Sequence, residues 1–132
     1  MLSVAESKNI QSELIPKIAS GFCGGIARTS GICGAVSGAI MAISIFCGRD
    51  LPDESLDKSY TPVQKLIETF ENKFGSTNCR ELTGCDLWTD EGRKRYLEAD
   101  MLERCRGYTG EATKMAMSII EGRPEAKVVA KA

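Results

Sequence analysis

Residues 29–48 read TSGICGAVSGAIMAISIFCG, a run of 20 residues without a charge between Arg28 and Arg49. The length suits a membrane-spanning helix, and Gly34 with Gly38 gives the G-x-x-x-G spacing of membrane helix pairs. The run nevertheless contains four glycines and no leucine, which makes it a poor apolar span. We therefore expect a central helix that the protein itself buries, and no membrane partner.

The rest of the chain shows helical rather than strand patterning, and it contains no Asn-Gly or Asp-Gly hairpin turn. Helices are expected at about 6–21, 61–74, 89–102 and 109–121, with a short one from about residue 76. Paired glycines make segment 22–27 look like a loop. The sequence predicts an all-α fold, a compact bundle of about five to six helices around a Gly/Ala-rich apolar helix at about 31–47. One domain is expected over 1–132, with a flexible tail at 122–132.

Composition excludes several classes of function. The 17 basic and 18 acidic residues nearly balance, so no nucleic-acid partner is expected. The chain has no histidine, which closes Ser–His–Asp and Cys–His catalysis, His-ligated zinc and His-ligated haem to this chain acting alone. Residues 1–20 do not read as a signal peptide, so a cytoplasmic location is expected. Six cysteines are many for that compartment, and they indicate redox or metal chemistry.

Two of the cysteines are expected near helix N-termini. If Ser30 caps the central helix, Cys33 falls at its third position; if Ser76 or Asn78 caps a later helix, Cys79 lies in its first turn. Free amide donors and the helix dipole would lower the thiol pKa there and favour the thiolate. The thiolate is the species that attacks disulfides and peroxides or binds metals. The alternative is that both cysteines are simply small buried apolar residues.

The other four cysteines leave more than one interpretation open. Cys85 follows Cys79 too far along a continuous helix to pair with it, although a helix break between them could allow the pair. Cys105 lies between two arginines that would favour a thiolate, or it packs at a helix junction. Cys23 lies in the glycine loop, and Cys47 reads as a core residue. No C-x-x-C motif occurs, but thiolates from separate elements could still hold an iron–sulfur cluster.

Three segments and a later cysteine carry a family resemblance. They are IASGF at 18–22, ICGAVSGAIM at 32–41, FGSTNCREL at 74–82 and the lone Cys105. Together, from about residue 14 to 121, they resemble a bacterial and archaeal family of redox-active proteins named for its C…GCAxxG…C…C pattern. The resemblance implies electron or thiol chemistry.

Carried over by position, Cys33 matches the cysteine of the central glycine-rich motif, and Cys79 and Cys105 match the two later cysteines. The family's first cysteine has no counterpart here. The resemblance implies that its helix would lie before Met1, which makes the chain short at its N-terminus, unless Cys23 substitutes. The associated backbone residues are Gly24, Gly25, Gly34, Ala35 and Gly38.

The first functional hypothesis is a thiol–disulfide or peroxide-handling redox protein, and so a thiol oxidoreductase. Cys33 would attack, with Cys79 or Cys105 as the resolving partner, while Cys23 and Cys85 are secondary thiols. Nearby glycines, namely Gly24, Gly25 and Gly34, would leave room for a substrate. The expected partner is a redox protein or a small thiol or peroxide substrate.

Two alternatives remain. One is an electron-transfer or sensor protein that holds an iron–sulfur cluster or another soft metal, with its ligands drawn from Cys33, Cys79, Cys85 and Cys105. The other is a helical interaction module in which the small-residue helix mediates packing or homodimer formation and the thiols are spectators.

Overall fold

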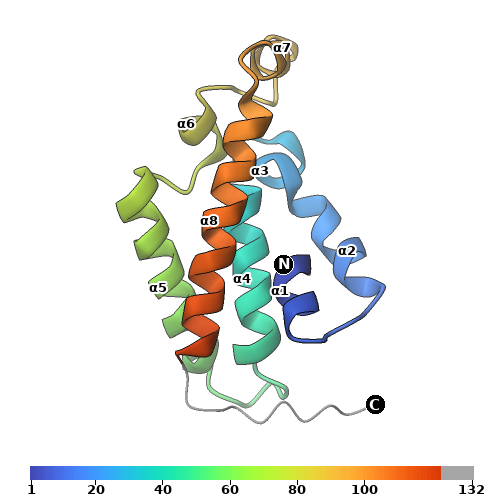
Figure 1. Ribbon diagram of the computed structural model, residues 1–132, viewed down its shortest axis with the longest axis vertical. Coiled ribbons are helices and arrows are strands. Elements are labelled where there is room, and N and C mark those ends of the chain that lie inside the picture. Colours follow the sequence, from blue (N-terminus) through green and yellow to red (C-terminus); the bar gives the residue numbers. More distant parts are fainter. Residues whose placement is uncertain (123–132) are drawn as a thin grey trace.

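A computed structural model describes residues 1–122 as an all-α protein (Figure 1). In chain order the elements are α1 (Leu2–Ser7), α2 (Leu14–Ala19), the 3-10 turn η1 (Ser20–Phe22), α3 (Cys23–Arg28), α4 (Gly34–Cys47), α5 (Asp57–Phe74), α6 (Cys79–Thr83), α7 (Asp90–Glu98) and α8 (Met101–Glu121). Of the predicted tail 122–132, residues 123–132 lie outside the described part of the chain. Within residues 1–122 no helix combines the length and the apolar character needed to cross a membrane.

The core forms where α4, α5 and α8 pack against one another, with α8 running along most of the molecule (Figure 1). Small and large side chains meet there: Val36, Ala39 and Ile43 from α4, Leu66 and Phe70 from α5, and Tyr108, Ala112 and Ala116 from α8. Burying one side chain of the size of leucine or phenylalanine contributes about 1.5–3 kcal/mol. The prediction of a central apolar helix is confirmed. It begins at Gly34 rather than residue 31, because Cys33 has an extended backbone and takes the N-cap position.

The N-terminal third differs from the predicted helix at 6–21. It contains two short helices, because Asn9 adopts a left-handed φ of 58° after α1. Pro16 lies near the start of α2, where the missing N–H does little harm. Val4 and Ala5 of α1 are buried, and α1 contacts both α4 and α8.

Segment 24–28 is a left-handed helical turn rather than the predicted loop. Its φ angles lie between 50° and 67°, and they include the non-glycine residues Ile26, Ala27 and Arg28. The left-handed region costs about 1–2 kcal/mol for each such residue. Two hydrogen bonds hold the turn: Gly31 N donates to Gly25 O at 3.1 Å, and Thr29 Oγ1 donates to Ile26 O at 2.9 Å.

The C-terminal helix is longer than predicted. α7 ends at Glu98 and α8 begins at Met101. Between them Asp100 turns the chain with a left-handed φ of 47°. Gly107 and Gly110 lie inside α8. Packing of Tyr108 against the core outweighs their low helix propensity. Cys105 therefore lies within the first turns of a long helix instead of at a helix junction.

Candidate functional site

Cys33 and Cys79 are brought together by a short antiparallel pairing of the segments that precede α4 and α6. Cys33 N donates to Thr77 O and Cys79 N donates to Gly31 O, both at 2.7 Å, around a bridge between Ile32 and Asn78. In this register Cys33 and Cys79 are diagonal neighbours on one face of the pair.

Cys33 is the N-cap of α4 rather than its third residue. Ser30, the expected cap, instead contacts the segment between α6 and α7: its Oγ donates to Asp86 Oδ1 and accepts from Leu87 N, both at 2.9 Å. Burial raises the pKa of the Cys33 thiol. The backbone amides of the first turn of α4 face the sulfur and partly offset this effect, although neither makes a full capping hydrogen bond.

Cys79 is the first residue of α6, with Asn78 as the N-cap that accepts from Glu81 N at 3.2 Å. Of the two caps considered from the sequence, Asn78 is therefore correct. Burial raises the pKa of Cys79 to about 11, and Cys33 and Cys105 add to the rise. The expectation of lowered thiol pKa values at these helix ends is wrong, because the loss of hydration outweighs the amides and the dipole.

Cys105 faces the same region from α8. It is half-buried, and the Tyr96 hydroxyl of α7 donates to its Sγ at 3.2 Å. Burial, followed by this contact and the nearby cysteines, raises the pKa of Tyr96. Arg106, expected to act on Cys105, instead pairs with Glu103 at 3.3 Å.

Four of the six cysteines line one cavity of about 390 Å³. Cys23, Cys33, Cys79 and Cys105 line it, and so do all the predicted backbone residues: Gly24, Gly25, Gly34, Ala35 and Gly38. Cys85 does not line it; this buried thiol packs with Cys79 and Leu87. The structure therefore brings together three cysteines that are far apart in sequence and adds Cys23 at the rim.

Two of the predicted glycines do not leave room for a substrate. A Cβ on Gly25 would lie 2.5 Å from Cys79 Cβ, and a Cβ on Gly34 would lie 3.1 Å from Phe22 O. The protein's own atoms fill both spaces. These glycines are needed for close packing around the cysteines, and Gly25 also has a φ of 66°.

Across residues 1–122 no three Cys, His, Asp or Glu side chains are arranged to hold a metal ion. The iron–sulfur hypothesis drew its ligands from Cys33, Cys79, Cys85 and Cys105, and Cys85 does not face the cavity wall that the other three share. Its Sγ donates instead to Thr83 O at 3.5 Å.

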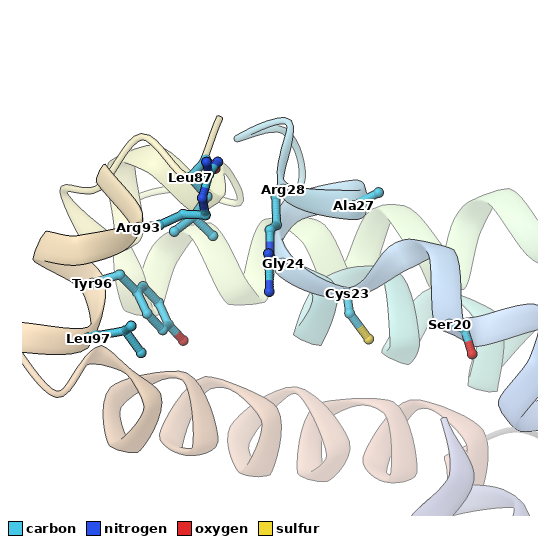
Figure 2. Close-up of a pocket in the computed structure, with 9 residues that line it drawn as sticks. All are labelled: Ser20, Cys23, Gly24, Ala27, Arg28, Leu87, Arg93, Tyr96 and Leu97. Carbon is cyan, nitrogen blue, oxygen red and sulfur yellow. The ribbon is translucent and has the colours of Figure 1, made fainter. Parts of the chain in front are cut away.

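Sequence reasoning missed Tyr96 and a second cavity. The second cavity is about 700 Å³, with Tyr96 and Leu97 of α7 on one side and Cys23 and Ser20 on the other (Figure 2). Cys23, Gly24 and Tyr96 line both cavities. No motif marks Tyr96, because its contact with Cys105 depends on the turn between α7 and α8.

Comparison with known proteins agrees with this arrangement. Residues 1–119 match the family described as "Putative redox-active protein (C_GCAxxG_C_C)", so the match begins at residue 1 rather than about residue 14. The chain is also 33% identical over 107 residues to an uncharacterized protein of Archaeoglobus fulgidus, which covers 74% of this chain and 71% of that protein. No solved structure matches the chain significantly. With all six cysteines inside the matched range, the chain belongs to the C_GCAxxG_C_C family of redox-active proteins.

Proposed function

We propose that this protein is a thiol oxidoreductase that performs thiol–disulfide exchange in the cysteine-lined cavity. One observation carries the proposal: Cys33, Cys79 and Cys105 come from three separate elements and face one cavity. The electrostatic influence of Cys33 and Cys105 on the pKa of Cys79 supports their proximity. A reducing compartment such as the cytoplasm suits these thiols.

Cys33 and Cys105 form the exchanging pair in this proposal. The amides at the start of α4 partly offset the effect of burial on the Cys33 thiol, and the Tyr96 hydroxyl donates to Cys105 Sγ. Cys79 is the alternative partner, and its thiol is more buried than that of Cys105. With a pKa of about 11, Cys79 is also the weaker nucleophile at neutral pH.

The reaction balances with a disulfide as the oxidant. The Cys33 thiolate attacks one sulfur of the substrate, which breaks the substrate S–S bond and releases the first thiolate. Cys105 then attacks Cys33 Sγ, which releases the second thiolate and leaves a Cys33–Cys105 disulfide. Two electrons pass from the two cysteines to the substrate, and the cysteine protons end on the released thiols.

Mass spectrometry of the folded protein after brief treatment with diamide, a small thiol oxidant, tests this proposal. We expect a Cys33–Cys105 disulfide as the main product. Cys33→Ser and Cys105→Ser should each abolish it, whereas Cys85→Ser, at a buried thiol off the cavity wall, should not. Folded protein in which Cys33 and Cys105 both stay reduced would overturn the proposal.

A further inference from the structure

The cavity lined by Arg28 (the outer cavity) and the cavity lined by the buried Cys33 and Cys79 (the inner cavity) share Cys23 in their walls. Cys23 is exposed, whereas Cys33 and Cys79 are only 7% and 6% exposed. The outer cavity has a volume of about 700 Å³ and the inner cavity a volume of about 390 Å³. Cys23 is therefore the cavity thiol most accessible to a sulfur compound that comes from solvent.

Backbone packing places Cys23 next to the start of α4. A Cβ on Gly34 would lie 3.4 Å from Cys23 Cα, so the chain at Cys23 is in contact with the residue that follows Cys33. No side chain separates the two backbones there, because residue 34 is glycine. Cys23 and Cys33 therefore share both a backbone contact and a cavity wall.

The outer cavity is cationic. Its lining residues include Arg28 and Arg93 and no acidic side chain. The Arg93 guanidinium already has partners within the protein: its Nη1 donates to Leu87 O at 2.8 Å, and its Nη2 pairs with Asp90. Arg28 has no ion-pair partner among residues 1–122, so its charge remains for a ligand.

We infer that the outer cavity binds a small, negatively charged disulfide, with an anionic group on Arg28 and a sulfur atom facing Cys23. This inference rests on the proposed function and names its substrate class and its entry thiol, so that the disulfide attacked by Cys33 is the mixed disulfide formed on Cys23. The charge of Arg28 attracts the anion, and the cavity, open on the side of Leu97, admits the organic part.

The chemistry proceeds in three exchanges. The Cys23 thiolate attacks the substrate, forms a mixed disulfide and releases one thiolate. Cys33 then attacks Cys23 Sγ, which releases the second thiolate and forms a Cys23–Cys33 disulfide. Finally Cys105 attacks Cys33 Sγ, which returns Cys23 to the thiol form. The two electrons gained by the substrate come from Cys33 and Cys105.

Three disulfide probes of different charge test the charge requirement: oxidised glutathione is anionic, bis(2-hydroxyethyl) disulfide is neutral and cystamine is cationic. The loss of thiols is followed in the folded protein. We expect Arg28→Gln to slow oxidation by oxidised glutathione about two- to fivefold, to leave the neutral probe unchanged and to leave cystamine unchanged or faster. Arg28→Lys should restore most of the rate, and Arg49→Gln, at the far end of α4, should have no effect.

Replacement of Cys23 tests the entry thiol. We expect Cys23→Ser to form no glutathione adduct at residue 23 and to oxidise its inner thiols at least about tenfold more slowly with oxidised glutathione. Diamide should still form the inner disulfide in this variant. Unchanged rates in Cys23→Ser, or an equal effect of Arg28→Gln on all three probes, would overturn the inference. Failure of diamide to oxidise the wild-type inner pair would instead reject the proposed function.

Discussion

The hydroxyl of Tyr96 is the polar group that most directly affects Cys105, to which it donates at 3.2 Å. Tyr96→Phe keeps the ring and removes this donor, so the Cys105 sulfur loses the hydrogen bond that it accepts. We expect iodoacetamide to alkylate Cys105 about tenfold more slowly at pH 8 in this variant. Mass spectrometry of the alkylated peptide measures the rate.

The control for Tyr96→Phe is Tyr60→Phe, because the Tyr60 side chain is 53% exposed and lies away from the cysteines. Alkylation of Cys105 should be unchanged there. If both variants react like the wild type, the hydroxyl does not activate Cys105.

Cys79 gives the protein a pH dependence of stability. Its pKa in the folded state is about 11, above the ordinary value of 9.0. As the pH rises past 9, the unfolded chain loses this proton first, so the folded state is destabilised between about pH 9 and pH 11, by up to about 1.4 kcal/mol for each unit of pKa difference. Below pH 9 this contribution is fully present.

Urea unfolding of the wild type and of Cys79→Ser at pH 7.5 and pH 10.5 measures this effect. We expect the wild type to lose more stability than the variant over this range, because only the wild type carries the buried thiol. Equal losses would show that the Cys79 thiol stays protonated to the same extent in both states.

The sequence identified the cysteines that face the cavity better than it identified their chemistry. Cys33, Cys79 and Cys105 were marked by a motif that is readable without a structure. Their protonation was not, because the pKa of Cys33 and Cys79 is raised chiefly by burial, which the local sequence does not report. The contact between Tyr96 and Cys105 was not predictable either, because it depends on the turn between α7 and α8.

At the scale of elements, the left-handed turn at 24–28 supports Cys79. Gly25→Ala would place a Cβ 2.5 Å from Cys79 Cβ in a residue whose φ is 66°. We expect it to lower the free energy of unfolding by about 2–4 kcal/mol, from strain and overpacking together. Thermal unfolding of this variant should show a clear decrease in the melting temperature.

Gly21→Ala is the matched control, because a Cβ there meets no atom within 4 Å. Its effect should stay within about 0.5 kcal/mol. If both alanine variants melt at the same temperature, the contact between Gly25 and Cys79 is not required for folding.

Element boundaries followed from the sequence where local signals were strong. Gly75, in a left-handed conformation with a φ of 85°, ends α5 as predicted. The start of α5 came earlier than predicted, because Leu56 O accepts Tyr60 N at 2.9 Å and adds a turn before Pro62. The turn at 24–28 could not be foreseen, since Ile26 and Ala27 are residues that avoid a positive φ.

At the scale of the whole molecule, Tyr108 ties α8 to α6. Its buried hydroxyl donates to Leu82 O at 3.1 Å, so it connects the helix that carries Cys105 with the helix that carries Cys79. We expect Tyr108→Phe to lower the free energy of unfolding by about 1–2 kcal/mol, because a buried carbonyl loses its partner. Urea unfolding measures the change, and a stability equal to that of Tyr60→Phe would contradict it.

The all-α class and the central apolar helix were predictable, because both follow from periodicity and from an uncharged run bounded by arginines. The cavity was not predictable. It depends on the bridge between Ile32 and Asn78 and on the close approach of Gly34 to Cys23. These contacts join residues far apart in the chain, and no local pattern encodes them.

The bridge between Ile32 and Asn78 has a mechanical consequence. Because it joins the segments before α4 and α6, a new bond that pulls on Cys33 also loads the segment that leads to Cys79. α4 is anchored by the core, whereas α6 spans only Cys79–Thr83 and exposes Arg80 and Glu81. α6 also contributes Leu82 to the core and accepts the hydrogen bond from Tyr108, so strain introduced at Cys33 would be shared by both helices.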